Sequence, residues 1–208
     1  LGHEITVLDS LVGSSICRDE ILRSGIKFIQ HDIRDLESLN NFDNQFDAIV
    51  HLAAQTSVQY SILHPEETKE INVEGTNAVI RFAKRFNIKR IIAASSSAVY
   101  GDSKEESHQI GNEGIQISPY AETKYENETQ VLRFRSDGFE AIALRFFNVF
   151  GPGQTSTGAY SAVIPTFIEK ILKGQPCTVF GDGLQTRDFI FVQDVIELLL
   201  NLSTRRSL

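Results

Sequence analysis

The sequence contains no methionine, and its 208 residues include only two cysteines, Cys17 and Cys177. There is no initiator methionine, and Leu1-Gly2-His3 leads directly into an apolar stretch, so we expect a fragment or the ordered part of a longer protein. The isolated cysteines lack the spacing of metal ligands, and the five histidines lack it too. We therefore predict no metal site and no disulfide framework, and we expect a reducing, cytoplasmic location.

Long apolar runs and clusters of basic residues are also missing. No run reaches the length that spans a membrane, and no signal peptide is recognisable, so we expect no membrane partner. The formal net charge is -7, without a local concentration of lysine or arginine, which argues against a nucleic-acid partner. With 41% hydrophobic and 23% charged residues, the chain has the composition of a globular protein that can build one core and part of a second.

Short apolar segments alternate with helical patterns over most of the chain. We predict strands at residues 3–9, 26–29, 46–52, 90–94 and 141–144. We predict helices between them, the first beginning at Ser14 or Ser15 and ending at residue 22, and the others at residues 35–41, 65–87 and 119–137. Nearly continuous apolar strands separated by helices are typical of a parallel sheet with helices on both faces. The predicted fold class is therefore α/β, a Rossmann-like doubly wound parallel sheet.

The pattern changes after Gly151. We predict a loop at 151–158, a helix at 162–173, strands at 177–180 and 189–192 around a Gly181-Asp182-Gly183 turn, and a helix at 194–202. Residues 1–150 would then form the main domain. Residues 151–208 would form part of a smaller C-terminal lobe, with some segments returning to the main domain.

Polar and small residues follow several of the predicted strands. Asp9 and Asp32 come at or after the first two strands, and residues 53–55 and 95–97 follow the next two. In an open parallel sheet, ligands bind beyond the carboxyl ends of the strands. Asp9 suits the acid that binds the adenosine ribose of a dinucleotide and would repel a 2′-phosphate, which favours NAD over NADP. The alternative for Asp9 is a capping or turn aspartate.

Tyr120 and Lys124 lie one turn apart on the helix predicted to start at Pro119, with Ser118 as its N-cap. A free tyrosine, with a pKa of about 10, is a poor base at neutral pH. A nearby ammonium lowers that pKa and lets the phenol exchange a proton with a substrate hydroxyl. The alternative is a half-buried tyrosine beside a solvated lysine.

These segments together resemble the extended short-chain dehydrogenase/reductase family, specifically its NAD-dependent nucleotide-sugar epimerases and dehydratases. The resemblance covers nearly the whole chain in family order. Its motifs are Val7-Leu8-Asp9, Asp32-Ile33-Arg34-Asp35, His51-Leu52-Ala53-Ala54, Asn72-Val73-Glu74-Gly75-Thr76, Ser95 to Gly101, Tyr120-x-x-x-Lys124, Arg145 to Pro152, Phe180-Gly181-Asp182-Gly183 and Gln185-Thr186-Arg187-Asp188-Phe189.

The resemblance implies NAD as cofactor, an NAD-binding domain over residues 1–150 and part of a substrate-binding lobe over 151–208. The implied cofactor contacts are Asp9 at the adenosine ribose, Asp32 and Ile33 at the adenine, Leu52, Ala53 and Ala54 near the phosphates and ribose, and Lys124 and Phe147 at the nicotinamide end, with Asn72 helping to fix the loop beneath the cofactor. For Asn72, a polar residue inside a helix is the alternative. The glycine-rich turn that should precede Asp9 is not in the sequence.

The resemblance also implies a mechanism. Tyr120 would remove the proton of a sugar hydroxyl while hydride leaves the same carbon for NAD, and Ser96 would hold the resulting ketone. Ser97 would contact the substrate. For each serine, the alternative is a local turn bond at the end of a strand.

Two residues after Ser96 bear on the reaction class. Dehydratases that resemble this segment carry acidic side chains there, and decarboxylases tend to, whereas this chain has Ser97 and Ala98. Neither side chain acts as a carboxylic acid or base. The sequence therefore favours an epimerase.

The resemblance places the substrate contacts in the last third of the chain. Asn148 and Arg187 would bind the diphosphate, for which arginine suits through its planar donor fork. Val163 and Phe180 would line the pocket for the nucleotide base. The alternative for Arg187 is a surface ion pair with Asp188 or Asp182.

We therefore expect an epimerase acting at C4 of a UDP-hexose or of its N-acetyl or uronic-acid form. The alternatives are dehydration or decarboxylation from the same 4-keto intermediate, and a non-catalytic NAD-binding module, against which Tyr120, Lys124 and Ser96 count. Because the strand and glycine turn before Asp9 are missing, we expect this chain alone to bind NAD weakly. We also expect a homodimer formed by the helices that start at Pro65 and Pro119.

Overall fold

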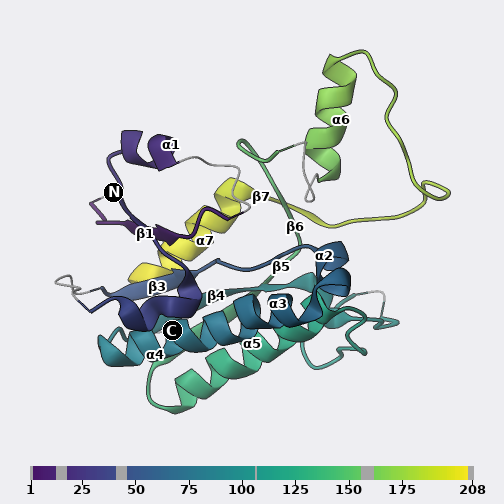
Figure 1. Ribbon diagram of the computed structural model, residues 1–208. Coiled ribbons are helices and arrows are strands. Elements are labelled where there is room, and N and C mark those ends of the chain that lie inside the picture. The colour runs from purple at the N-terminus through teal and green to yellow at the C-terminus, as the bar shows by residue number, and fades with distance from the viewer. Residues whose placement is uncertain (1, 13–17, 41–45, 106, 156–161, 206–208) are drawn as a thin grey trace.

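The computed structural model describes residues 2–12, 18–40, 46–105, 107–155 and 162–205 (Figure 1). Its strands are β1 Thr6–Asp9, β2 Lys27–Gln30, β3 Ala48–His51, β4 Arg90–Ser96, β5 Glu140–Phe146, β6 Asn148–Phe150 and β7 Phe189–Phe191. Its helices are α1 Arg18–Arg23, α2 Val58–Leu63, α3 Pro65–Lys69, α4 Gly75–Arg85, α5 Pro119–Ser136, α6 Val163–Leu172 and α7 Val192–Thr204. Two 3₁₀ helices, η1 Ile33–Ser38 and η3 Ser97–Tyr100, and the π-helical segment η2 Glu70–Glu74 complete these elements.

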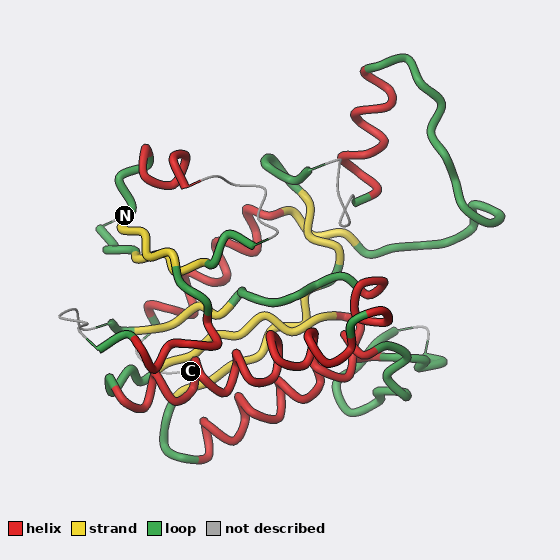
Figure 2. Tube along the Cα trace, viewed as in Figure 1, coloured by secondary structure: helices red, strands yellow, loops and turns green. Residues whose placement is uncertain are grey.

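All the strand pairs are parallel, as predicted, and they form three separately hydrogen-bonded groups among the described residues: β1–β2, β3–β4–β5 and β6–β7 (Figure 2). Helices α4 and α5 cover one face of the three-stranded group, and α7 lies on the other (Figure 1). The α/β class and the helices on both faces are thus confirmed. The predicted single sheet is divided, since β1 and β3 are not paired with each other.

The core lies between the three-stranded group and helices α4 and α5. Its buried members include Ala83, Ile91, Val131 and Phe134, each 1% exposed or less. This burial orders α5, whose own sequence is mostly polar, against β4 and β5. The start of α5 is thereby fixed beside the carboxyl end of β4, where the predicted catalytic residues lie.

Local signals set the ends of α5 as the sequence predicts. The Ser118 hydroxyl accepts a 3.2 Å hydrogen bond from the Ala121 amide, and Pro119 occupies the first turn. After the helix, Gly138 adopts a φ of +87°, a left-handed conformation that glycine adopts without a Cβ clash.

The long helix predicted at 65–87 is interrupted. It begins at Pro65 as expected and ends at Arg85, but η2 inserts a π-helical turn between α3 and α4. A π-turn breaks the regular bonding pattern and is common at functional sites. Helix α2 was not predicted, although Ser57 caps it by accepting a 3.0 Å bond from the Tyr60 amide.

Two local predictions need correction, and one lies outside the described residues. The helix expected to start at Asp35 begins at Ile33, because the Asp32 carboxylate caps it through the Arg34 amide at 2.8 Å. Residues 177–180 form no strand and pair with no described strand, and Phe180 is 81% exposed. Strand β6 was not expected. The proposed caps Ser14 and Ser15 are not among the described residues.

The last part of the chain contains two kinds of structure. Helix α6 has no buried residue and stands away from the sheets, joined to β7 by a long loop (Figure 1). By contrast, β7 pairs with β6, and α7 packs on β3 and β4. The boundary at residue 150 stays a prediction.

Candidate active site

Tyr120 and Lys124 lie in the first turns of α5, and both are buried, at 8% and 4% exposure. The Lys124 Nζ donates a 2.9 Å hydrogen bond to the carbonyl oxygen of Ala94 in β4. Burial of the ammonium lowers the pKa of Lys124 to about 8. Lys124 is therefore not the solvated lysine of the alternative interpretation.

Ser95 and Ser96, at the end of β4, have different hydrogen-bond partners. The Ser96 hydroxyl accepts a 3.1 Å bond from the Ala98 amide and caps η3, which is the local turn bond considered as the alternative to a catalytic role. The Ser95 hydroxyl instead donates a 2.5 Å bond to Glu128 Oε1 on α5. Ser96 and Ser97 are half-buried, so their hydroxyls lie at the border of the protein interior.

An ion-pair network that the sequence analysis missed lies beside these serines. Arg145 in β5 binds both oxygens of Glu128, with Nε–Oε1 and Nη2–Oε2 distances of 2.8 and 2.7 Å. Its Nη1 also binds Glu113 Oε1 at 2.5 Å, and its guanidinium lies 4.6 Å from the ring centroid of Tyr100. These carboxylates raise the pKa of Arg145. Glu128 follows Lys124 by one helical turn, and this spacing was an available signal.

Asn72 lies in the π-helical segment and binds the loop after β3. Its side chain accepts a 2.8 Å bond from the Gln55 amide and donates a 3.0 Å bond to the Gln55 carbonyl. It also donates to Thr123 Oγ1 on α5 at 3.0 Å, while Asn127 Nδ2 donates to the Asn72 carbonyl at 2.9 Å. Asn72 thus links the loop that carries Ala53 and Ala54 to α5.

His51, at the end of β3, belongs to the same buried region. Its Nε2 lies 3.0 Å from Thr76 Oγ1. Burial, together with the charge of Lys124, lowers the pKa of His51 to about 3. The imidazole is therefore neutral at physiological pH.

Asp9 and Asp32 lie at the carboxyl ends of β1 and β2. The Asp9 carbonyl accepts a bond from the His31 amide at 3.1 Å, and Asp9 Oδ1 accepts one from Leu11 at 2.7 Å, a turn bond. Asp32 forms a 2.7 Å ion pair with Arg34, whose hydrogen bond lowers the Asp32 pKa. The two acids thus share one sheet edge, as predicted.

The remaining predicted cofactor residues differ in their surroundings. Ile33 has its side chain in the core, so only its backbone is available to an adenine. Ala53 and Ala54 are half-buried with small side chains, Leu52 is 52% exposed, and the Phe147 ring lies 6.1 Å from that of Tyr100.

These residues fit the two ends of NAD. Asp9 offers a carboxylate for an adenosine ribose, and Lys124 has three N–H groups, of which one binds Ala94. The small Ala53 and Ala54 allow close approach of a ligand to the backbone. The fit does not extend to the pyrophosphate, because the sequence holds no glycine-rich turn before Asp9.

The predicted substrate residues lie in the exposed last third of the chain. Asn148 Nδ2 donates a 2.8 Å bond to the Asp188 carbonyl, which places Asn148 next to Arg187. Arg187 donates to the Thr186 carbonyl and forms no ion pair within the described ranges. Val163 is 45% and Phe180 81% exposed, so the structure shows no enclosed base pocket around them.

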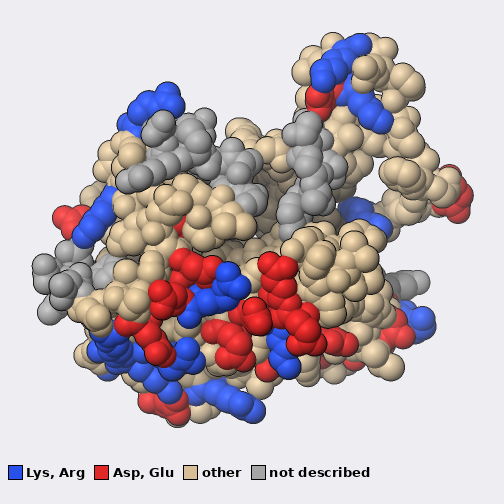
Figure 3. Space-filling model, viewed as in Figure 1, with Lys and Arg blue, Asp and Glu red and all other residues tan. Residues whose placement is uncertain are grey.

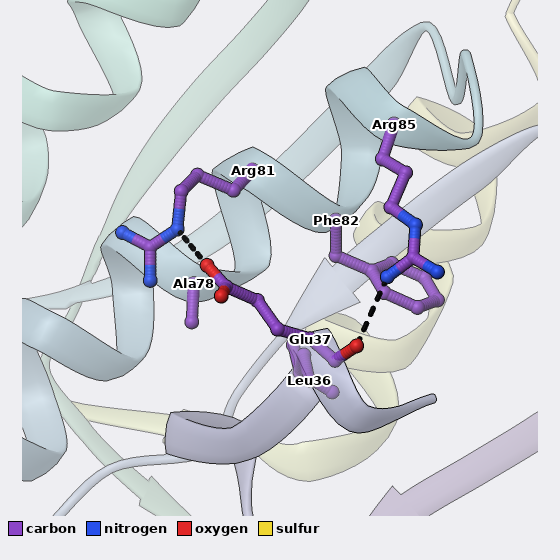
Figure 4. Close-up of a pocket in the computed structure, with 6 residues that line it drawn as sticks. All are labelled: Leu36, Glu37, Ala78, Arg81, Phe82 and Arg85. Atoms are coloured by element: carbon purple, nitrogen blue, oxygen red, sulfur yellow. Dashed lines mark hydrogen bonds and ion pairs between the residues drawn. The ribbon is translucent and has the colours of Figure 1, made fainter. Parts of the chain in front are cut away.

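A shallow pocket between η1 and α4 contains none of the predicted site residues (Figure 4). Arg81 and Arg85 both extend from α4 toward Glu37, one to its carboxylate at 2.8 Å and one to its carbonyl at 3.1 Å. Both guanidinium groups are already paired, so this pocket is a poor candidate for an anion site.

The surface carries mixed charge. Acidic side chains, with some basic ones between them, gather over α3 and its π-helical continuation, which contribute Glu66, Glu67, Glu70 and Glu74 (Figure 3). Among the described residues, no helix is long and apolar enough to cross a membrane. No group of three histidine, cysteine or acidic residues in this part of the chain could hold a metal ion.

A parallel α/β fold in which a buried Tyr-x-x-x-Lys helix packs against a serine-bearing strand end defines a dinucleotide-dependent short-chain dehydrogenase/reductase. A sequence model of the NAD dependent epimerase/dehydratase family matches residues 1–207. The chain belongs to this NAD-dependent family.

Individual relatives support this family membership. A putative UDP-glucose 4-epimerase of Methanocaldococcus jannaschii is 35% identical over 202 residues, covering 93% of this chain and 63% of the relative. A UDP-N-acetyl-alpha-D-glucosaminuronate decarboxylase of Bacillus cytotoxicus is 33% identical over 201 residues, covering 94% and 62%. The solved UDP-N-acetylglucosamine 4-epimerase of Methanobrevibacter ruminantium M1, in complex with UDP-N-acetylmuramic acid, superposes with a TM-score of 0.87. It is 33% identical and covers 98% of this chain and 66% of that one. The chain thus spans less than two thirds of the length of these relatives.

Proposed function

We propose that the protein containing this chain is an NAD-dependent epimerase that inverts C4 of a nucleotide sugar, a UDP-hexose, UDP-N-acetylhexosamine or UDP-hexuronate. The observation that carries this proposal is the burial of Lys124 beside Tyr120, with its ammonium bonded to the strand that leads to Ser96. Lys124 forms no ion pair with a carboxylate in the described part of the chain, and an unpaired buried ammonium is costly. Groups whose pKa is shifted in this way cluster at functional sites.

In the proposed mechanism, Tyr120 takes the proton of the C4 hydroxyl and later returns it. The Lys124 ammonium stabilises the phenolate and binds the ribose at the nicotinamide end. NAD, when bound, would supply the redox chemistry at C4. The Ser96 hydroxyl would donate a hydrogen bond to the C4 oxygen of the sugar, and inversion at C4 would require the sugar to present its other face in the site.

The residues around Ser96 support epimerisation over its alternatives. Ser97 and Ala98 carry no carboxyl group, whereas elimination of water requires an acid and a base near C5 and C6. The carboxylates that the structure places by this strand, Glu113 and Glu128, are both held by Arg145. Dehydration and decarboxylation remain the alternative reactions, since a decarboxylase is among the relatives.

The substrate would bind through residues from several elements. Ser97 would contact the sugar, Asn148 and Arg187 the diphosphate, and Val163 and Phe180 the base. The relatives named above act on UDP-linked compounds, which supports a UDP carrier. For assembly, we propose a homodimer through the helical faces of α3–α4 and α5.

The test is to incubate the whole protein with UDP-glucose, UDP-galactose and their N-acetyl forms, with and without NAD, and to identify the products by NMR. We expect interconversion of C4 epimers, with Tyr120→Phe lowering kcat by about 10³-fold. Tyr125→Phe is the matched control, because Tyr125 lies on the same helix but is 43% exposed. A 4-keto-6-deoxy sugar or carbon dioxide as product would refute epimerisation. Bound NAD without turnover of any sugar would favour a cofactor-binding module.

A further inference from the structure

Arg145 holds two carboxylates from different parts of the chain in a nearly buried position. Its side chain is 11% exposed, and those of Glu113 and Glu128 are 15% and 13% exposed. The contact with Glu128 is bidentate, the geometry in which a guanidinium fixes a carboxylate most firmly. Buried ion pairs lose much of their Coulomb energy to desolvation, so stability alone is a weak explanation for this cluster.

Glu128 connects the cluster to the strand that bears the serines. Tyr120, Lys124 and Glu128 follow one another at single-turn intervals and share one face of α5. Lys124 binds the Ala94 carbonyl, and Glu128 binds the hydroxyl of Ser95, the next residue. The face that begins at Tyr120 is therefore attached to β4 at two consecutive residues.

This attachment fixes the residue that follows. Neighbouring side chains of a strand point to opposite sides, so anchoring Ser95 to α5 sets the direction in which Ser96 leaves the strand. Arg145 also lies over the ring of Tyr100, the last residue of η3, and His108 stacks with that ring at 4.6 Å. The segment from Ser95 to Tyr100 is thus held at both ends. Glu128, which pairs with Arg145, binds Ser95, and Arg145 itself lies over the ring of Tyr100.

Glu113 extends the same cluster to the loop between η3 and α5. It accepts bonds from the Gly111 amide at 3.1 Å, and the neighbouring Gly114 amide binds the Tyr100 carbonyl at 3.0 Å. The Gly111 amide and Arg145 lower the pKa of Glu113. Arg145 therefore ties this loop back to the strand end.

We propose that Glu128 and Arg145 are positioning residues that set the placement of the Ser96 hydroxyl relative to Tyr120 and Lys124. They act through Ser95 and Tyr100 and do not contact the substrate. This inference rests on the proposed function, because it assigns the cluster to the chemistry of that site.

The first test compares Glu128→Gln with Glu126→Gln in the whole protein. Glu126 is an exposed glutamate on the same helix, outside the cluster. A misplacement of a reacting group by about 1 Å costs on the order of 10²-fold in rate, so we expect kcat per mole of bound NAD to fall by about 10²-fold in Glu128→Gln. KM for the nucleotide sugar should change less than about twofold, because ground-state contacts are kept. Unchanged kcat per bound NAD would overturn the proposal, since misfolding alone lowers only the amount of loaded enzyme.

A second test does not depend on activity. Amide hydrogen exchange of residues 98–101 should be at least about tenfold faster in Glu128→Gln and Arg145→Met than in Glu126→Gln, because the strand end loses its anchor. Equal exchange in all three variants would overturn the inference. A wild-type protein that turns over no nucleotide sugar but shows this dependence would refute the proposed function and still support the control of the strand end by Glu128.

Discussion

The Lys124 ammonium donates a 2.9 Å hydrogen bond to the carbonyl oxygen of Ala94, the residue before the serine run of β4. The bond fixes the distance between α5 and the end of the strand. It is also the one hydrogen bond that the structure gives this ammonium within the described residues, and burial lowers the Lys124 pKa to about 8. Keeping Lys124 protonated in the folded chain therefore costs free energy of unfolding, and measuring stability as a function of pH can reveal this cost.

The first prediction concerns alkaline pH. The pKa of Lys124 is about 8 in the folded chain, against 10.5 for a freely solvated lysine such as that of the unfolded chain. Below pH 8 both states are protonated and the cost of the buried charge is fully present. Between these values the folded state loses its proton first, so from about pH 7.5 to pH 10 the free energy of unfolding rises by about 2 kcal/mol relative to Lys124→Met, which does not titrate. Urea unfolding of both proteins at about pH 7.5 and 10 measures this, and parallel pH dependence would contradict it.

The second prediction concerns acid. The pKa of His51 is about 3 in the folded chain, against 6.5 without burial. Between these values the unfolded state binds the extra proton, so stability is lost as the pH falls below 6.5. From about pH 7 to pH 5 the chain should lose about 2 kcal/mol more than His51→Gln, whose amide can still reach Thr76 but does not titrate. Urea unfolding at the two pH values gives the difference, and equal losses would show that His51 accepts a proton without unfolding.

Local signals explain which parts of this fold the sequence predicts. Ser118, Pro119 and Gly138 lie within or beside α5 and determine its ends through their own backbone geometry, so its bounds are predictable to about a residue. Residues 177–180 have an apolar pattern typical of a strand, but a strand needs a neighbour, and none of the described strands pairs with them. Pairing depends on distant segments and is not contained in the local pattern.

The candidate site likewise contains residues that the local sequence predicts and residues that it does not. The Tyr120 and Lys124 pair is recognisable because both residues lie within one helical turn. Arg145 binds partners 17 and 32 residues away, and nothing near Arg145 in the sequence indicates them. The π-turn around Asn72 is likewise hidden, because the side chains that bind its Asn72 and Val73 carbonyls, Asn127 and Gln130, lie 55 and 57 residues away in the sequence.

The third prediction concerns Arg90, which fixes the end of α7. Its guanidinium, 8% exposed, donates to the carbonyls of Leu202, Ser203 and Arg205 at 2.9, 2.9 and 2.7 Å and pairs with Glu140. Arg90→Met should lower the free energy of unfolding by about 3 kcal/mol, because it leaves these acceptors without their donor. Arg81→Met is the control: its ion pair with Glu37 is more than half exposed, and its loss should cost less than about 1 kcal/mol. Similar urea midpoints for the two variants would show that α7 does not depend on Arg90.

The fourth prediction concerns cofactor binding by this chain alone. Asp9 and Asp32 belong to the β1–β2 group, whereas Ala53, Ala54 and Lys124 lie on or beside the β3–β4–β5 group, and no hydrogen bond between strands joins the two groups in the described structure. Binding NAD across both groups requires their relative placement to be fixed, which opposes binding through lost conformational freedom. The sequence also lacks the glycine-rich turn that would bring backbone amides to the pyrophosphate.

We therefore expect calorimetry on the 208-residue chain to show NAD affinity weaker than micromolar, and on the whole protein to show much tighter binding. Asp9→Asn should weaken binding to the whole protein, because the adenosine ribose loses its carboxylate acceptor. Asp35→Asn is a matched control, since Asp35 is an exposed aspartate close to the same sheet edge but outside the proposed site. Micromolar binding by the chain itself would show that the two strand groups already hold the geometry NAD requires, and that the glycine turn adds affinity rather than creating the site.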